Sequence, residues 1–340
     1  MLEILLNNSR SFGGYENKTS QADLAVWERI AERYSIVDGY TADLGAYQIQ
    51  IDWQSRVRYE RNYCDLWIKG VDNDFDRFDK FEFERVHVCP VKVHFDAAST
   101  CAYQGGMHEL HSVLIYLFLV ANLATPGSFN LYRSFIRDTE RDPTKDSLAQ
   151  TDLELSEYVF ENAWHEAQTY PWLKVGFLPF DQVAAWLESL NIKNKNVATT
   201  DLDRALFSLL YLGRASFMDP TAAMWIAAAL EALFDTPSGS SFSFLCARIS
   251  ALFSLKDPEA IDMKRRLRAF FDLRNAFAHG GARIHHILAD DRDKAVEGDI
   301  GRLLEVTGFA SAVLIAAIQE LIRRDWKGMS FCEQIVPLTE

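Results

Sequence analysis

Three residues near the end of one predicted helix have types and spacing that could act on a phosphate. The segment 268–281 reads RAFFDLRNAFAHGG and contains Arg274, Asn275 and His279. In a helix, Asn275 and His279 are four residues apart and share a face, whereas Arg274 lies about 140° around the axis from His279 and can bend towards it. The helix dipole favours a charged imidazole at a C-terminus, which suits a general acid or base, and an Arg can hold a phosphate through two parallel hydrogen bonds.

This helix is the most basic segment of an acidic chain. The 340 residues include 35 Lys and Arg against 48 Asp and Glu, a net charge of −13, which disfavours broad non-specific binding to nucleic acid. Residues 261–283 nevertheless hold six basic residues against Asp262 and Asp272. Such a run fits either a solvated helix face or a groove that faces phosphates. The candidate phosphate-binding residues are Lys264, Arg265, Arg268, Arg283 and His285, of which His285 can equally be a plain loop residue.

Motifs for other chemistries fail. The chain has no GxxxxGK[ST], GxGxxG or GxSxG sequence. Residues 72–76 resemble the start of a calcium loop, but Arg77 and Phe83 stand where Gly and a bidentate Glu are needed. His108 and His111 are three residues apart, with no third ligand nearby. The sequence therefore predicts no metal site and no cofactor.

Composition and hydropathy predict a cytoplasmic protein. The five cysteines are scattered and none has CxxC spacing, which argues for a reducing compartment. The longest apolar run, 113–121, is too short to span a membrane, and the start lacks the basic and apolar regions of a signal peptide.

The helices and strands that must position these residues fall into two predicted domains. Residues 1–140 are expected to form an α+β domain with a β-sheet, because a helical pattern at 22–34 and an apolar helix at 109–124 flank strand-like alternation at 46–100. The polar residues 141–151 are the predicted linker. Residues 152–330 are expected to form an all-α bundle, with helices at 153–170, 180–190, 201–217, 221–234, 243–255, 258–279 and 302–324.

The second domain resembles the HEPN superfamily of small helical bundles. The sequence Arg274-Asn275-x-x-x-His279 is similar to its R-[polar]-x-x-x-H motif, in the form LRNxxxHG. The Apea-like branch is further suggested by AALEALF at 228–234 and by Arg248 in LCARISALF. The likeness covers roughly residues 200–325, and nothing in residues 1–140 resembles a known family.

The resemblance implies a metal-independent endoribonuclease with Arg274, Asn275 and His279 as catalytic residues and Glu231 and Arg248 as structural support. It also implies a homodimer that joins two motifs, an RNA substrate such as tRNA, and a role in bacterial stress or phage defence. The acidic first domain, with 19 basic and 29 acidic residues in positions 1–200, would then sense a protein or small-molecule trigger, regulate the nuclease or recognise substrate.

Two other function classes stay open. A HEPN-like domain can be inactive and serve for dimerisation or nucleotide binding, with Arg274 pairing with Asp272 or Glu231 only to hold helices together. Since Arg and His suit phosphates generally, a hydrolase of a small phosphorylated molecule is also compatible with the residues.

Overall fold

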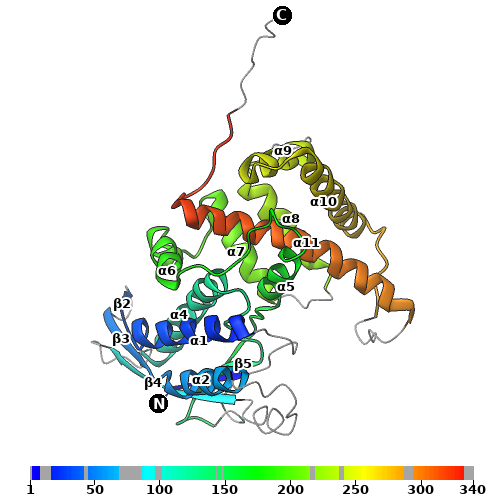
Figure 1. The fold of residues 1–340 in the computed structure, drawn as a ribbon. Coiled ribbons are helices and arrows are strands. Elements are labelled where there is room, and N and C mark those ends of the chain that lie inside the picture. The colour runs from blue at the N-terminus through cyan, green and yellow to red at the C-terminus, as the bar shows by residue number, and fades with distance from the viewer. Residues whose placement is uncertain are drawn as a thin grey trace, which may run out of the picture. The chain divides into compact units, whose positions relative to one another are not determined.

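The computed structural model divides the chain into two compact units. It describes residues 2–7, 17–41, 45–68, 86–95, 102–142, 144, 146, 149–214, 219–236, 241–286 and 294–332 (Figure 1). The first unit comprises Met1–Tyr158 with Gly176–Ser189, and the second comprises Val159–Val175 with Leu190–Glu340. The chain thus passes between the units three times. This differs from the predicted linker at 141–151, because Gln150 and Thr151 pair in a strand of the first unit. The calcium-loop-like segment 72–76 lies outside the described residues.

The first unit is built on an antiparallel sheet of six strands in the order β2-β3-β4-β1-β5-β6. Its strands are β1 (Leu2–Asn7), β2 (Ile36–Thr41), β3 (Gly45–Ile51), β4 (Val86–Phe95), β5 (Ser134–Asp138) and β6 (Gln150–Leu153). The central strands β1 and β4 place Ile4 opposite Cys89, and both side chains are fully buried. An α+β fold with a β-sheet is therefore confirmed for the first part of the chain.

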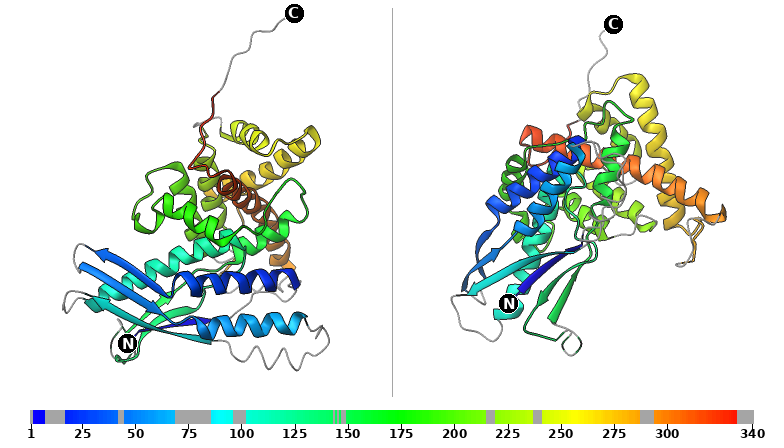
Figure 2. Two further views of the ribbon diagram at one scale, coloured as in Figure 1. Left: turned by 60° about the vertical axis from the view of Figure 1, so that its left-hand side comes forward. Right: turned by 60° about the horizontal axis from the view of Figure 1, so that its bottom comes forward.

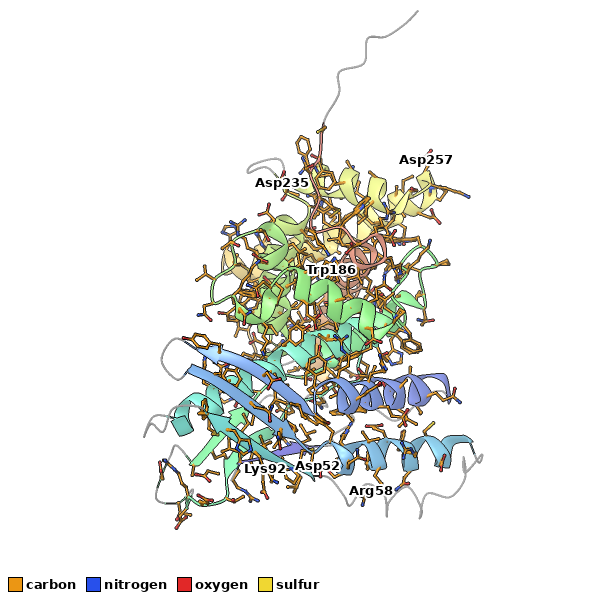
Figure 3. The ribbon with its side chains drawn as sticks, turned by 90° about the vertical axis from the view of Figure 1, so that its left-hand side faces the viewer. Asp52, Arg58, Lys92, Trp186, Asp235 and Asp257 are labelled. Carbon is orange, nitrogen blue, oxygen red and sulfur yellow. The ribbon has the colours of Figure 1, made fainter. Side chains whose placement is uncertain are left out.

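One face of the sheet is covered by helices, as Figure 2 shows. These are α1 (Asn17–Arg33), α2 (Gln54–Ile68) and α4 (Ala102–Ala124). On the covered face, Ile49 and Val91 are buried, whereas Gln48 and Lys92 (the latter labelled in Figure 3) alternate with them towards the other face. This alternation is typical of an antiparallel sheet with one packed face. Helix α6 (Phe180–Ser189) also belongs to this unit, packs against α4 and buries Trp186.

Two parts of this unit were not predicted correctly. Residues 54–68 lie within the stretch expected to be strands, but they form α2, which begins where the Asp52 carboxylate accepts a hydrogen bond from the Gln54 N–H (2.9 Å). The apolar residues Trp53, Val57 and Cys64 recur at helical spacing and are buried, and this period outweighs the local content of aromatic residues. The strands β1, β2, β5 and β6 were also missed.

Close approach of β2 and β3 requires a glycine. Gly39 lies opposite Tyr47, and a Cβ atom at Gly39 would fall 2.2 Å from the Tyr47 ring. The Tyr47 ring crosses β2, and its hydroxyl donates a hydrogen bond to Oε2 of Glu109 on α4 (2.5 Å). Burial and this hydrogen bond raise the pKa of Tyr47. The pair therefore ties the β2–β3 hairpin to the helical layer.

A group of charged and aromatic side chains is buried between α1, α2 and β4. The Arg56 guanidinium pairs with Glu60 (2.5 Å) and lies 4.7 Å from the ring centre of Trp27. The ring of His87 lies 4.5 Å from the ring of Tyr59, and its Nε2 atom is buried without a hydrogen-bond partner among the described residues. Burial, with a smaller contribution from Arg56, lowers the pKa of His87 to about 3. His87 is therefore a neutral core residue.

The second unit is mostly helical. Its helices are α5 (Tyr158–Ala167), which starts at the unit boundary, α7 (Asp201–Arg214), α8 (Thr221–Leu233), α9 (Ser241–Phe253), α10 (Asp257–Ala278) and α11 (Lys294–Arg324). The helices predicted from periodicity are confirmed within a few residues, although α5 and α11 differ more at their starts. Before α8, Pro220 stands at the N-cap position and the Asp219 carboxylate accepts a hydrogen bond from the Thr221 N–H (2.8 Å).

Helix α11 forms the centre of this unit. Phe309 to Ile318 are all buried, and α8 and α10 both pack against the helix. Gly308 allows close packing of α5, because a Cβ atom there would lie 2.7 Å from Nδ2 of Asn162. The rings of Tyr170 and Trp172, in the segment that follows α5, pack against Phe309 in the middle of α11 (ring centres 5.1 and 6.2 Å apart).

Helix α7 is fixed at its N-terminus by a buried carboxylate. Asp203 is fully buried and accepts hydrogen bonds from Nζ of Lys195 (2.8 Å) and from the backbone N–H groups of Thr199 and Thr200 (3.0 Å each). In turn, the Thr200 hydroxyl accepts a hydrogen bond from the Asp203 N–H (3.1 Å). Burial alone would raise the pKa of Asp203, but these donors outweigh it and hold the pKa at about 2. This reciprocal capping aligns α7 against α8.

In the part of the chain that the structure describes, two helices are long and apolar enough to cross a membrane by length and composition alone. They are Gly105–Ala124 of α4 and Val296–Arg324 of α11, and 72 % of each apolar window is buried inside the structure. This burial is compatible with a soluble protein in which both serve as core helices. Cys64, Cys89, Cys246 and Cys332 are free thiols, while Cys101 lies outside the described residues.

Candidate functional site

The three motif residues lie at the C-terminal end of α10, and Arg274 continues the line of buried residues along this helix. The helix begins at Asp257 and Pro258, and the Glu259 carboxylate accepts a hydrogen bond from the Lys256 N–H (2.9 Å). Met263, Leu267 and Phe270 are buried at spacings of four and three residues. Arg274 is the next residue in this series, so the Arg of the motif faces the core at its end.

Arg274 connects the motif to the neighbouring helix α8. Its Nη1 donates a hydrogen bond to Oδ1 of Asn275 (3.0 Å), and its Nη2 lies 3.5 Å from Oε2 of Glu231. The Arg274 side chain is about one quarter exposed (26 %), and its Nε atom is buried without a hydrogen-bond partner in the described part of the chain. The guanidinium is thus oriented from two sides while part of it stays accessible.

His279 stands at the C-terminus of α10 with an exposed side chain. Its N–H bonds to the Asn275 carbonyl (3.0 Å), and Gly280 then adopts a left-handed conformation with φ +74°. The N–H of Gly281 closes the turn on the carbonyl of Ala276 (2.7 Å). Gly280 therefore ends the helix, and His279 is left at the negative end of the helix dipole.

Four of the predicted residues form a row on the exposed side of α10. Lys264, Arg268, Asn275 and His279 are all exposed. At 100° per residue they fall within about 60° around the axis, and the row is about 22 Å long. Hence Lys264 and Arg268 cannot reach a phosphate held by His279, although they can contact other phosphates of an extended strand.

Several basic residues of α10 already have partners. Asp262 pairs with Arg265 and also accepts a bond from Nε of Arg266 (3.1 Å). The Arg268 guanidinium lies 3.7 Å from the ring centre of Phe242 on α9. Asp262 therefore offsets much of the positive charge in the first half of the helix. The side chains of Lys264 and Arg268 are exposed on its surface.

The two remaining phosphate candidates meet on one carboxylate. Nη1 of Arg283 lies 3.0 Å, and Nε2 of His285 3.1 Å, from the same Oδ2 atom of Asp299. Asp299 lies in the first turns of α11 and was not among the predicted site residues. No local pattern could have found it, because it meets Arg283 and His285 only after the chain has turned back from α10 into α11.

Arg248 supports the site from a distance. Its Nη1 donates hydrogen bonds to the carbonyls of Phe234 (2.7 Å) and Asp235 at the C-terminus of α8. Its guanidinium also lies 4.5 Å from the ring centre of Phe331. Arg248 therefore caps the helix that presents Glu231 to Arg274.

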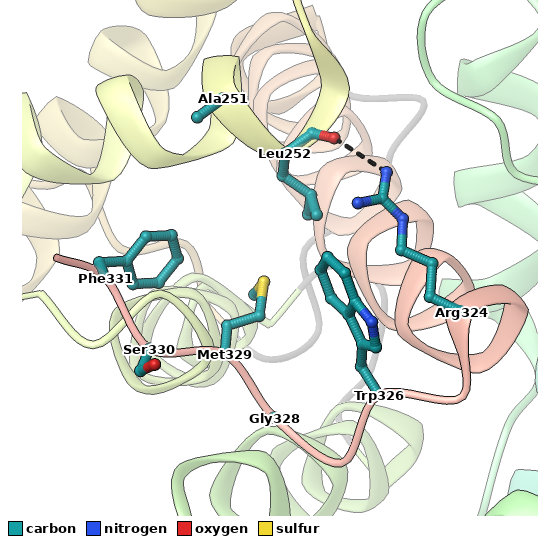
Figure 4. Close-up of a pocket in the computed structure, with 8 residues that line it drawn as sticks. All are labelled: Ala251, Leu252, Arg324, Trp326, Gly328, Met329, Ser330 and Phe331. Carbon is teal, nitrogen blue, oxygen red and sulfur yellow. Dashed lines mark hydrogen bonds between the residues drawn. The ribbon is translucent and has the colours of Figure 1, made fainter.

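A cavity of about 320 Å³ lies elsewhere in the second unit, where α9 and α11 end (Figure 4). Arg324 lies beside it, stacked 4.6 Å from the Trp326 ring centre, and its Nη2 lies 3.5 Å from the Leu252 carbonyl. The Arg324 guanidinium is also neutralised by Glu320 (2.7 Å). None of the residues lining this cavity belongs to α10, so it is separate from the motif.

Comparison with known proteins gave no relative: no family model, no curated protein and no solved structure matches the chain. In the described residues, no group of three or more His, Cys, Asp or Glu side chains could hold a metal ion. The chemistry of the site therefore has to be inferred from the residues on α10 and their neighbours.

Proposed function

We propose that the protein is a metal-independent endoribonuclease of the HEPN type, with Arg274, Asn275 and His279 as its catalytic residues. The observation that carries the proposal is the arrangement of the motif on α10. Arg274 is held by Asn275 and Glu231, and His279 is exposed at the helix end one turn beyond Asn275. A general base and a phosphate-binding cation thus stand five residues apart at the C-terminal end of one helix, where His279 is exposed and the Arg274 side chain is about one quarter exposed.

RNA supplies its own nucleophile for such a site. His279 takes the proton of a ribose 2′-hydroxyl, and the 2′-oxygen attacks the adjacent phosphorus. Arg274 stabilises the added negative charge, with Asn275 as a further hydrogen-bonding group. The bond from phosphorus to the 5′-oxygen breaks, and a general acid protonates that oxygen. The products are a 2′,3′-cyclic phosphate and a 5′-hydroxyl, and DNA is inert because it lacks the nucleophile.

The general acid is supplied by His279 of a second copy in a homodimer. The HEPN resemblance supports this assignment, since it pairs two copies of the motif. Among the histidines near one motif, Nε2 of His285 lies 3.1 Å from Oδ2 of Asp299, whereas His279 and His286 are exposed. The nuclease acts in the cytoplasm on cellular RNA such as tRNA, as a stress or defence effector, and the first unit responds to its trigger.

The test is cleavage of total RNA in EDTA by the wild-type protein and by His279→Ala. The variant should lose at least about 100-fold in rate, as expected for removal of a general base. His94→Ala is the matched control, because His94 is an exposed histidine of the first unit and should leave the rate unchanged. Fragments with cyclic phosphate ends are expected. Equal cleavage by wild type and His279→Ala would refute the assignment.

A second function is favoured by the contact between Arg274 and Glu231. If this pair only joins α8 to α10, the unit is an inactive module that dimerises or binds a nucleotide. A folded, dimeric wild-type protein that cleaves no RNA, while Glu231→Gln lowers its unfolding temperature, would support that function instead. Expression in bacteria separates the two as well, since only the nuclease predicts toxicity that His279→Ala removes.

A further inference from the structure

The edge strand β2 of the first unit exposes both apolar side chains and backbone groups. Ile36 is 56 % and Tyr40 is 75 % exposed, and Asp38 lies between them on the same face. These exposed fractions are unusual for large apolar residues on a sheet edge, where natural proteins place charges or covers. The side chains alternate with Val37, which is buried on the helix-covered face.

The hydrogen-bond pattern shows which backbone groups of β2 point outward. The Ile51 N–H bonds to the Ser35 carbonyl (2.9 Å), so residues 35 and 51 form a hydrogen-bonded pair. In an antiparallel ladder the pairs alternate, which makes 36/50, 38/48 and 40/46 the non-hydrogen-bonded pairs. The N–H and C=O groups of Ile36, Asp38 and Tyr40 therefore point away from β3, and no described residue bonds to them.

The opposite edge of the sheet is protected. Strand β6 has only four residues, and Gln150 donates a hydrogen bond to the Asp152 carboxylate along it (2.9 Å). A short, polar strand of this kind is a usual defence against pairing with another chain. Strand β2 has six residues and two large apolar side chains, so the two edges differ in the feature that controls strand addition.

Charge decides which occupant fits this edge. Pairing of β2 with a second copy in the antiparallel register that joins the outward-facing groups of Ile36, Asp38 and Tyr40 places Asp38 directly opposite Asp38 of that copy. Like charges in this position destabilise a sheet. The Asp38 carboxylate accepts one bond from Nε2 of Gln48 (2.8 Å) and still offers acceptor positions across the edge. A basic side chain opposite Asp38 satisfies this geometry.

We propose that β2 binds an extended segment of a partner protein, which adds a seventh strand to the sheet. The segment carries a Lys or Arg opposite Asp38 and apolar residues two positions to either side, opposite Ile36 and Tyr40. Backbone hydrogen bonds supply the affinity, and the alternate side chains supply the specificity. This proposal does not depend on the ribonuclease activity.

The probe is the capped heptapeptide TVTKTVT, titrated to millimolar concentration into the ¹⁵N-labelled full chain, with TVTETVT as its charge-reversed control. Binding of the first peptide should shift the amide signals of Ile36, Asp38 and Tyr40 and slow their hydrogen exchange. The Glu peptide should bind at least about threefold more weakly, since opposite- and like-charged cross-strand pairs differ by roughly this amount. In Asp38→Lys this preference should reverse.

Absence of shifts at β2 with either peptide would overturn the proposal. So would equal binding of the two peptides, or a preference that Asp38→Lys leaves unchanged. Amide signals of the buried strand β1 show whether the variant retains its fold. If the free chain protects the same three amides by self-association, a second copy is the occupant, and the proposed partner segment is wrong.

Discussion

His87 gives a quantitative test of the packing in the first unit. The change is His87→Gln, which keeps a neutral polar side chain but removes the titrating ring. With a pKa of about 3 in the folded protein against 6.5 in the unfolded chain, the unfolded state binds a proton below pH 6.5 that the folded state rejects. Stability therefore rises with pH in this window, and it is lost progressively as the pH falls from 6.5 towards 3.

The magnitude follows from the width of the window. Between pH 7 and pH 5, His87 lowers the free energy of unfolding by about 2 kcal/mol. One pKa unit corresponds to about 1.4 kcal/mol, and 1.5 units separate pH 6.5 from pH 5. The His87→Gln protein should lack this loss. Urea unfolding of both proteins at pH 7 and pH 5, followed by the fluorescence of buried Trp27 and Trp53, measures the difference.

An NMR titration of the imidazole provides an independent check. The His87 signals should stay unchanged between pH 7.5 and pH 5. A His87 midpoint above about pH 5 would refute the reasoning. The same would follow if wild type and His87→Gln lost equal stability between pH 7 and pH 5.

Three further outcomes are expected. Asp203→Asn should lower the free energy of unfolding by about 2–3 kcal/mol at pH 7, since it removes the charge that holds Lys195 and caps α7; urea unfolding measures this, and a change below 0.5 kcal/mol would contradict it. Asp299→Asn should release Arg283 and tighten binding of a non-cleavable RNA, with a steeper salt dependence; unchanged affinity at low salt would exclude Arg283 from the interface. Gly280→Ala should cost about 1–2 kcal/mol through its positive φ alone, visible as a lower unfolding temperature, because no atom crowds a Cβ there.

The helices of the second unit could be predicted because their signals are local. Apolar residues repeat at helical spacing, and Pro220 and Gly280 mark a start and a stop in the sequence itself. The placement of Arg274, Asn275 and His279 at the end of one helix could be predicted from the same helical spacing. Pairing across helices follows no such rule, so Asp299 as the partner of Arg283 was not predicted.

The sheet was harder to predict for the same physical reason. Strand β1 lies between β4 and β5, and its partner residues are at least 79 positions away in β4 and at least 130 away in β5, so its short apolar segment does not indicate its partners. In α2, aromatic residues favour a strand locally, but burial of Val57 and Cys64 at helical spacing decides the structure. Local preference yields here to long-range packing.

The order in which the first unit is synthesised has a consequence for its folding in the cell. Helix α4 ends at Ala124, but α6, which covers part of it through the Tyr116–Ala184 hydrogen bond (3.2 Å), starts only at Phe180. At about 5–20 residues per second, a ribosome needs roughly 3–11 s to bridge this gap. During that delay the most apolar helix of the unit lacks one of its covers, while α5, which belongs to the other unit, has already been made. The nascent chain therefore exposes part of the apolar surface of α4 until α6 has been synthesised. Exposed surface of this kind is what chaperones bind.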